Sequence, residues 1–425
     1  MKLSLFKKVK SIGSKVGPGI ITGAADDDPS GILTYLQSGF LYGFKILWLA
    51  FLALPFMISV QEMAGRIGYV TDHGLVRIIK DHYSKTLLYF IAVISVVVIT
   101  MNIGADLLAL GAVLETLVPL GVVLWVLIAA LAILFFTVFL SYPRFASVLK
   151  WLTLSLFFYV ATAFFIHIDW GSVFRATFVP VFLPDKDFIM LVAAFFGTTI
   201  SPYLFFWQAD EEVEDRDEEK GKRKLKRFLV TKNELKHMRR DTALGMVFSE
   251  IITWFILVSA GGLAVAKGSA VIATFQEASS VLRPLLGPYA FIIFSIGIVG
   301  TGLLAVPVLA GSIGYMLAEI FNWREGMNKT WREAKSFYLV IALSTLAGVC
   351  MTVLRIDPIA ALIYTAVFYT IITPPIVFII LRIANNRSIM HEKTNGIVAN
   401  VFGGLTFVFA LAVAVAYLAS VFGWI

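Results

Sequence analysis

Two long hydrophobic segments of this chain are each interrupted near the middle by polar residues that precede a proline. The first interruption runs from Asp26 to Gly31 with the sequence DDDPSG, and the second runs from Gly197 to Tyr203 with the sequence GTTISPY. Lipid cannot hydrogen-bond free backbone groups, so a broken helix at bilayer depth persists only where it lines a cavity or lies inside protein. Because a carboxylate at that depth is costly, paired interruptions of this kind indicate a substrate site inside a transport protein.

The composition indicates a membrane protein with many spans. Of its 425 residues, 59% are hydrophobic and only 15% are charged, whereas about a quarter of the residues of soluble domains are charged. The single cysteine, Cys350, excludes an internal disulfide and a thiolate metal cluster. The sequence has no HExxH, GxSxG or phosphate-loop motif, so we expect neither an enzyme nor a cofactor.

Eleven segments are apolar over the roughly 20 residues that a membrane span needs. The predicted spans cover residues 17–43, 46–65, 87–112, 120–141, 146–168, 187–209, 242–266, 284–318, 336–354, 358–381 and 397–423. The first and the eighth are long enough to tilt or to break.

The distribution of positive charge predicts the orientation. With the N-terminus inside, 29 of the 35 Lys and Arg residues fall on the inner side, which is the pattern of the positive-inside rule. The net charge of +7 is therefore a topology signal, and we expect no nucleic-acid partner. Residues 1–16 carry five lysines without a following short apolar core and cleavage site, so we interpret them as a cytosolic N-terminus. We expect a multi-pass protein of the cell membrane.

The inner segment 210–240 begins with an acidic run and continues with a basic one. A solvated, partly disordered connector is the simplest interpretation of such a charge run. A regulatory role in sensing cations is the alternative.

Asp28 and Ser201 each precede a proline and predict the start of a second half-helix. Proline suits the first helical position, Asp and Ser are preferred caps before it, and the residue before proline avoids helical geometry. Asp28 lies about 11 residues into its span, roughly 16 Å deep at 1.5 Å per residue, near the middle of a hydrocarbon core about 30 Å thick. The first half-helices would end in unpaired carbonyls, so those near Ala25 and Thr198 would converge with Asp28 on a cation.

The spacing of the two interruptions predicts the architecture. They fall in spans 1 and 6, and because five is an odd number, two five-helix halves of opposite orientation follow. We predict an all-α polytopic membrane protein with inverted repeats at residues 17–168 and 187–381, the second containing the 210–240 loop. Residues 397–423 form an added eleventh helix.

The interruptions leave several roles open. Asp28 should face an aqueous pocket midway through the bilayer, although it could be a buried cap bonded only to backbone. Asp26 and Asp27 are either ligands or vestibule charges that point elsewhere. Ser201 is either a plain cap or a group that faces the ion.

Other polar residues in the spans are further candidates for the ion path. Glu250 in span 7 either lines the path or is a satisfied structural acid. Asn102 and Asp106 lie one helical turn apart in span 3 and could form a polar strip or bond between helices. Glu62 and Arg66, four residues apart, are most simply an ion pair.

Three motifs carry a resemblance to a known family. Residues 17–19 (GPG) followed by 28–31 (DPSG) resemble a first-helix signature that usually ends DPGN, and residues 61–68 (QEMAGRIG) resemble a second-helix end. Residues 201–203 (SPY) stand where the family carries Met-Pro-His. Over nearly its whole length the chain resembles the Nramp family of divalent metal transporters, which share a LeuT-type fold.

The departures from the family at the metal site are informative. Gly31 replaces the ligand asparagine, Ser201 replaces the ligand methionine, and Thr198 aligns with the alanine that donates a carbonyl. This pattern resembles the Nramp-related magnesium transporters, a divergent branch. A thioether favours softer metals, while oxygen ligands suit Mg²⁺, Ca²⁺ or Mn²⁺. Smaller side chains leave room for the waters that Mg²⁺ retains, so the resemblance implies import of partly hydrated Mg²⁺, with Mn²⁺ as a second substrate.

The resemblance also bears on proton coupling. Tyr203 replaces the helix-six histidine linked to proton movement. Asp106 matches a family aspartate, but the acid that the family carries three residues later is replaced by Ala109 here. We therefore expect passive, voltage-driven uptake, since each charge moved inward gains about 2.3 kcal/mol per 100 mV.

Three other functions remain to be weighed. The first is a proton-coupled Mn²⁺ or Fe²⁺ importer of the ordinary Nramp type, which would acidify a vesicle as Mn²⁺ enters. The second is a sodium-coupled carrier of an organic solute, against which the three aspartates argue. The third, a membrane enzyme, lacks a supporting motif. The expected partners are the metal ion and the lipid bilayer, with no obligatory protein partner.

Overall fold

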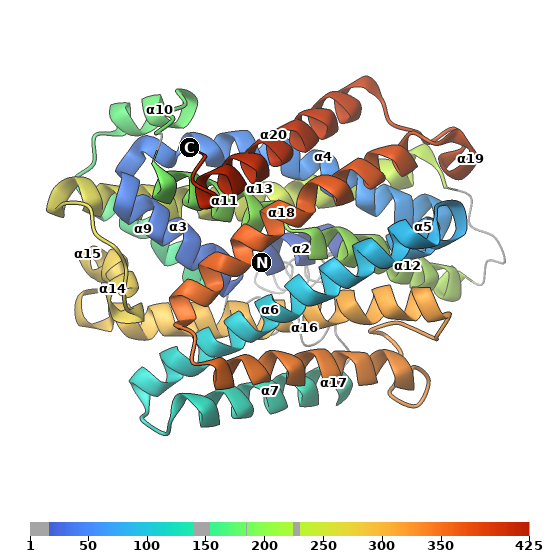
Figure 1. Ribbon diagram of the computed structural model, residues 1–425, viewed down its shortest axis with the longest axis horizontal. Coiled ribbons are helices and arrows are strands. Elements are labelled where there is room, and N and C mark those ends of the chain that lie inside the picture. The colour runs from blue at the N-terminus through green and yellow to red at the C-terminus, as the bar shows by residue number, and fades with distance from the viewer. Residues whose placement is uncertain (1–16, 140–153, 184, 224–229, 425) are drawn as a thin grey trace, which may run out of the picture.

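The computed structural model describes residues 17–139, 154–183, 185–223 and 230–424, and the regular structure in these ranges is helical (Figure 1). The helices of the first half are α2 (Pro18–Asp26), α3 (Pro29–Tyr42), α4 (Trp48–Thr71), α5 (Leu75–His82), α6 (Lys85–Leu117), α7 (Val122–Phe139), α9 (Phe157–Phe165) and α10 (Trp170–Phe178). Those of the second half are α11 (Lys186–Thr199), α12 (Pro202–Arg223), α13 (Lys232–Lys267), α14 (Phe275–Ser279), α15 (Arg283–Leu286), α16 (Ala290–Phe321), α17 (Lys335–Val349), α18 (Pro358–Ala384), α19 (Arg387–Met390) and α20 (Ile397–Val421). The all-α prediction is confirmed for these residues.

Both predicted interruptions are present in the structure. Helix α2 ends at Asp26 and α3 begins at Pro29, and α11 ends at Thr199 while α12 begins at Pro202. Asp28 has extended backbone geometry, with φ −71° and ψ 170°, as expected for a residue that precedes proline.

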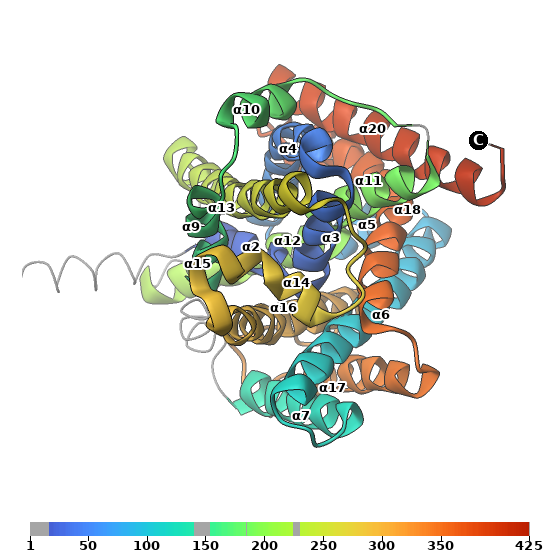
Figure 2. The same ribbon diagram turned by 90° about the vertical axis from the view of Figure 1, so that its left-hand side faces the viewer.

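The interrupted helices lie inside the bundle. Helices α7 and α17 lie side by side along one edge, and α4 and α20 lie towards the opposite edge, with α2, α3 and α12 between them (Figures 1 and 2). Every residue from Pro29 to Gly39 is buried, and a helix that is buried all round belongs to the core of a large assembly of helices.

Helix α2 packs against α13 with almost no side chain between the two backbones. A Cβ atom on Gly19 would overlap the backbone of Thr242, and a Cβ atom on Gly23 would overlap the backbone of Gly245. Small residues permit this close approach of helices. Asp241 of α13 also accepts a hydrogen bond of 2.7 Å from the Gly19 N–H, which satisfies one of the free donors at the start of α2.

Nine helical segments of the described chain are long and apolar enough to cross a membrane. They include α11 and α12 as one segment and the stretch from Phe275 to Phe321 as another. The first predicted span is divided into α2 and α3, each too short to count alone. Predicted span 5 falls partly on residues 140–153, outside the described residues. Residues 1–16 also lie outside them.

The interpretation of residues 210–240 as a solvated connector is wrong for its first part. Helix α12 continues through the acidic run as far as Arg223, and Asp210 and Glu212 are buried. The acids have partners that local charge density does not reveal. Glu214 accepts hydrogen bonds of 2.5 Å from the Tyr315 hydroxyl and 2.7 Å from the Met327 N–H. Residues 224–229 lie outside the described residues.

The predicted ion pair at the end of α4 is confirmed. Arg66 Nε lies 2.9 Å from Glu62 Oε1, and the Arg66 side chain is fully buried. Arg239 of α13 lies 2.7 Å from the same carboxylate. The pair thus joins α4 to α13.

Candidate functional site

The α2–α3 interruption is organised around the Asp28 carboxylate. Its Oδ1 accepts a hydrogen bond of 2.7 Å from the Gly31 N–H, which caps α3, and its Oδ2 accepts one of 3.0 Å from the Asn102 side-chain amide of α6. The Asn102 carbonyl in turn accepts a hydrogen bond of 3.3 Å from the Thr365 hydroxyl of α18. Three elements therefore fix the position of the aspartate.

The α11–α12 interruption is organised around the Ser201 hydroxyl. Ser201 Oγ lies 2.9 Å from the Gly197 carbonyl and 2.6 Å from the Thr198 carbonyl at the end of α11. A hydroxyl that donates backwards to these carbonyls keeps its lone pairs available on the opposite side. Ser201 is thus more than a cap, because its hydroxyl satisfies the end of the preceding helix.

The structure brings the two interruptions together. The Tyr203 hydroxyl of α12 donates a hydrogen bond of 3.1 Å to the Ala25 carbonyl of α2. Gly31 faces Thr198, since a Cβ atom added to the glycine would lie 3.2 Å from Thr198 Oγ1. Residues 178 positions apart in the chain therefore meet, and the predicted set of Asp28, Ala25, Gly31, Thr198 and Ser201 lies at one junction of four half-helices, which we call the junction.

Asp28 does not face an aqueous pocket in this conformation. Its exposed fraction is 2%, and both carboxylate oxygens accept hydrogen bonds from protein groups. The expectation of an open pocket is therefore not met, because Asp28 is buried and groups of α3 and α6 donate hydrogen bonds to both of its carboxylate oxygens.

Asp26 and Asp27 turn towards α13 instead of α6. The Ser249 hydroxyl lies 2.7 Å from Asp26 Oδ2 and 3.2 Å from Asp27 Oδ1. The next residue, Glu250, is buried, and within the described chain neither of its carboxylate oxygens has a hydrogen-bond partner. Glu250 is therefore not the satisfied structural acid of the simpler interpretation. Ser249 was missed as a bridging group, although its place directly before Glu250 was a signal.

Asp106 is fully buried on α6, one turn beyond the Asn102 that bonds to Asp28, and within the described chain neither of its carboxylate oxygens has a hydrogen-bond partner. The polar strip predicted on α6 thus faces the junction. Sequence reasoning missed Tyr35 and Thr199, whose hydroxyls lie 3.1 Å apart and join α3 to the end of α11.

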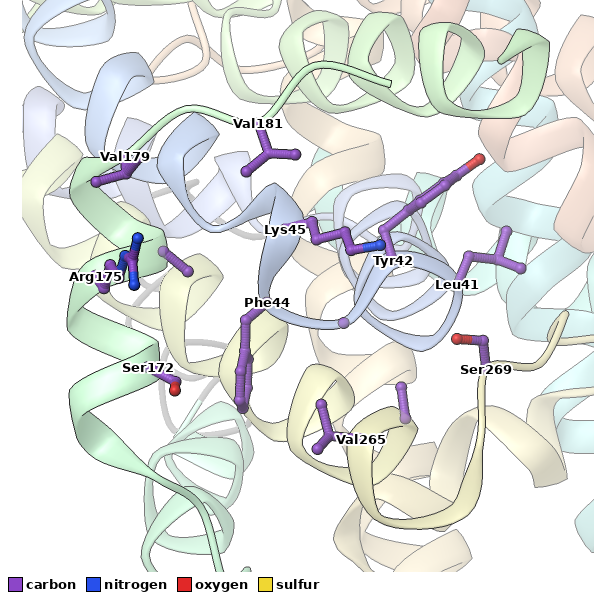
Figure 3. Close-up of a pocket in the computed structure, with 13 residues that line it drawn as sticks. Leu41, Tyr42, Phe44, Lys45, Ser172, Arg175, Val179, Val181, Val265 and Ser269 are labelled. Carbon is purple, nitrogen blue, oxygen red and sulfur yellow. The ribbon is translucent and has the colours of Figure 1, made fainter. Parts of the chain in front are cut away.

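A well-formed pocket of about 560 Å³ lies elsewhere, between the end of α3, α10 and the end of α13 (Figure 3). Leu41 and Tyr42, at its wall, are the last residues of α3, about 20 Å from Asp28 at 1.5 Å per residue. Figure 3 shows Lys45 beside Tyr42, and Arg175 on the α10 side. Two cations on an otherwise mainly apolar lining make this pocket unsuitable for a metal ion.

Comparison with known proteins places the chain in a family. The family model described as Natural resistance-associated macrophage protein-like, or Nramp, matches residues 19–420. The chain belongs to the Nramp family. The divalent metal cation transporter MntH of Granulibacter bethesdensis is 24% identical over 415 residues, which cover 93% of this chain and 87% of the relative. MntH of Pectobacterium carotovorum is 23% identical, with coverage of 92% and 90%. This Nramp protein is a divalent metal transporter and not an enzyme.

Solved structures show the fold of this Nramp protein. The manganese transporter of Eremococcus coleocola matches with a TM-score of 0.78 at 16% identity, covering 97% of this chain and 88% of that one. MhsT in complex with L-phenylalanine matches with a TM-score of 0.61 at 12% identity, covering 95% and 98%. The likeness bears out the predicted LeuT-type fold.

Proposed function

We propose that this protein imports Mg²⁺, and Mn²⁺ as a second substrate, through the junction of the two interrupted helices. The ligands are the Asp28 carboxylate, the Ser201 hydroxyl and the carbonyls of Ala25 and Thr198, with Gly31 leaving space for water. The chemistry of the polar groups at the junction carries this proposal. Carboxylate, hydroxyl and carbonyl oxygens suit hard divalent cations.

The present contacts of Asp28 support recognition of an ion that keeps part of its water. Mg²⁺ loses water reluctantly and is often held through one or two carboxylates. A metal-bound water presents O–H donors, and Asp28 now accepts from two N–H donors. In our proposal, bound waters replace one or both of these donors when the ion enters, so the carboxylate exchanges protein hydrogen bonds for equivalent ones.

We further propose that transport is not coupled to protons. Tyr203 stands where the resembling family carries a histidine, and its hydroxyl is engaged with the Ala25 carbonyl. Tyrosine has an ordinary pKa near 10 and does not exchange its proton readily at neutral pH. The membrane potential then supplies the driving force for inward movement.

The proposed orientation follows from the charge distribution. We place the N-terminus in the cytosol and the C-terminus outside, in the plasma or inner membrane, because 29 of 35 positive side chains then lie inside. The proposed division into repeats is residues 17–168 and 187–381, followed by the helix at 397–423.

Uptake of Mg²⁺ by proteoliposomes tests the proposal. Asp28→Asn keeps the size and the capping group but removes the charge. A unit charge pair at 4 Å is worth about 4 kcal/mol at an effective dielectric constant of 20, and a divalent ion doubles this. If only a quarter survives desolvation, about 2 kcal/mol is lost, which is roughly a 30-fold loss of affinity.

Ser30→Ala is the matched control. Ser30 is a buried neighbour whose hydroxyl donates a hydrogen bond of 3.0 Å to the Leu362 carbonyl, and its loss changes no charge. We expect near-normal uptake by this variant and little uptake by Asp28→Asn. Full activity of Asp28→Asn, or wild-type uptake that does not prefer Mg²⁺ over Ca²⁺, would overturn the proposal.

Proton-coupled import of Mn²⁺ is the second candidate. It is favoured by the buried Asp106 beside Asp28, and the Eremococcus coleocola relative is described as a manganese transporter. A pH-sensitive dye inside proteoliposomes separates the two functions. Acidification of the lumen that follows Mn²⁺ entry supports coupling, and an unchanged pH during measured Mn²⁺ uptake supports the uncoupled carrier.

A further inference from the structure

A second group of carboxylates lies further along α12 than the junction, partway between Pro202 and Arg223. Asp210 of α12, Glu319 of α16 and Glu325 in the segment after α16 each direct an oxygen to the same place, with these atoms within 4.8 Å of one another. Asp210 and Glu319 are each 5% exposed. We call this group the inner carboxylate cluster.

Two carboxylates of this cluster lack the partners that buried acids normally have. Among the described residues, Asp210 takes part in no hydrogen bond and no ion pair, although it is 95% buried. Glu325 Oε2 is wholly buried and likewise has no hydrogen-bond partner there. Because buried charges are normally paired or bound to metal, both side chains point to a missing positive ligand.

The nearby cations are engaged elsewhere. Arg77 Nε lies 2.8 Å from Asp81, and its Nη1 bonds to Asn322. Lys80 Nζ donates a hydrogen bond of 2.7 Å to the Ile320 carbonyl. Lys329 Nζ donates one to the main-chain carbonyl of Glu325 rather than to its carboxylate. In the described part of the chain, no Lys or Arg forms an ion pair with the inner carboxylate cluster.

Gly74 leaves the space beside these oxygens open. A Cβ atom added at Gly74 would overlap Asp210 Oδ1 and would lie 2.7 Å from Glu319 Oε1. Glu319 is itself held in place, since its Oε2 accepts a hydrogen bond of 2.9 Å from the Arg77 N–H in the first turn of α5. One point is thus surrounded by the fixed carboxylate of Glu319 and the unpartnered carboxylates of Asp210 and Glu325. Gly74, which has no side chain, leaves that point open.

We propose that Asp210, Glu319 and Glu325 bind a hard divalent cation, Mg²⁺ or Mn²⁺, at a site distinct from the junction. Three carboxylates supply oxygen ligands only, which suits these ions rather than zinc or copper. Asp210 and Glu319 directly follow the predicted spans 187–209 and 284–318, whose ends the charge distribution assigns to the cytosol. A bound ion would tie α12, which begins at the junction, to α16.

Binding of Mn²⁺ to the purified full-length protein in detergent tests this site, with free Mn²⁺ measured by its EPR signal. The Asp28→Asn variant serves as the background, so that any ion bound at the junction does not contribute. We expect one Mn²⁺ per chain in this background. Adding Glu325→Gln or Asp210→Asn should weaken the binding at least tenfold, and Mg²⁺ should compete.

Glu392→Gln is the matched control, because Glu392 is an exposed acid of another segment and the substitution changes the charge equally. It should leave binding unchanged. Gly74→Ala is a second variant that keeps all three acids and fills the space between them, and it should weaken binding as well. If Glu325→Gln and Gly74→Ala both bind Mn²⁺ like the background, the proposal is wrong. Failure of the junction proposal would instead appear as identical stoichiometry in wild type and Asp28→Asn.

Discussion

The contact between α11 and α18 gives a prediction that can be worked out from the structure. Gly197 lies two residues before the end of α11, where the helix touches the backbone of α18. A Cβ atom on Gly197 would overlap the Ala366 carbonyl oxygen and would lie 2.6 Å from Thr370 Oγ1. Ordinary contacts between heavy atoms are about 3.5–4.0 Å, so Gly197→Ala must push the helices apart by roughly 2 Å.

Gly404 of α20 provides the matched comparison. A Cβ atom added there meets no atom of the described residues within 4 Å. Replacing a glycine inside a helix by alanine gains about 0.5–1 kcal/mol, and this gain is common to both variants. The difference between them therefore isolates the steric term, and overpacking of this kind costs about 1–3 kcal/mol. Gly404→Ala should be as stable as wild type or more so, and Gly197→Ala should be less stable than Gly404→Ala by that amount.

Thermal unfolding in detergent, followed by tryptophan fluorescence, measures the order of stability. Mg²⁺ uptake by proteoliposomes measures the second effect, because α11 ends at the Thr198 carbonyl of the junction. We expect reduced uptake for Gly197→Ala and unchanged uptake for Gly404→Ala. A Gly197→Ala protein that is as stable and as active as Gly404→Ala would show that the close backbone contact of α11 and α18 is not needed.

Four other predictions concern separate parts of the molecule. Ser201→Met exchanges an oxygen ligand for a thioether, so in competition uptake Cd²⁺ should gain at least tenfold over Mg²⁺, and an unchanged preference would remove the serine from the ligand set. Within the described residues, Arg66→Ala leaves the Glu62 carboxylate paired with the half-exposed Arg239 alone, so stability should fall by about 1–3 kcal/mol, and a thermal scan that matches wild type would refute this. Hydrogen bonds, first from the Ser172 hydroxyl and then from the backbone N–H groups of Gly171 and Ser172, lower the pKa of Asp169 in the folded state. Its stabilising effect is therefore complete above the unfolded pKa of about 3.9 and is lost as the pH falls through the lower folded value, so Asp169→Ala should differ from wild type at pH 7 and approach it in acid, as acid titration by circular dichroism would show. Cys350 is exposed near the end of the apolar segment Lys335–Thr352, and this end is predicted to be external, so a membrane-impermeant maleimide should label intact cells, and labelling only after lysis would reverse the orientation.

The interruptions could be predicted from the sequence because their causes are local. A proline and the residue before it restrict the backbone wherever they occur, so the starts of α3 and α12 follow from Asp28-Pro29 and Ser201-Pro202 alone. The family resemblance then located the junction residues. Which groups would touch each other did not follow, because the contact of Tyr203 with the Ala25 carbonyl joins positions 178 residues apart.

The acidic run after Asp210 shows why the remainder was not predictable. A sequence displays charge but not the partners that satisfy it, so the run was interpreted as solvated. Glu214 is in fact held by Tyr315 and Met327, each more than 100 residues away. The expectation of an open pocket at Asp28 failed for a similar reason, since the Asn102 amide that donates a hydrogen bond to this carboxylate comes from another helix.

The glycine contact between α2 and α13 has a consequence for motion. Where side chains interlock, two helices can shift past each other only if these side chains change rotamer and separate. Along Gly19, Gly23 and Gly245 the surfaces are smooth backbone, and α2 is separated from α3 by the non-helical Asp27 and Asp28. The short α2 segment can therefore swing on these two residues once its hydrogen bonds to Asp241, Ser249 and Tyr203 are released, while α3 stays anchored in the core.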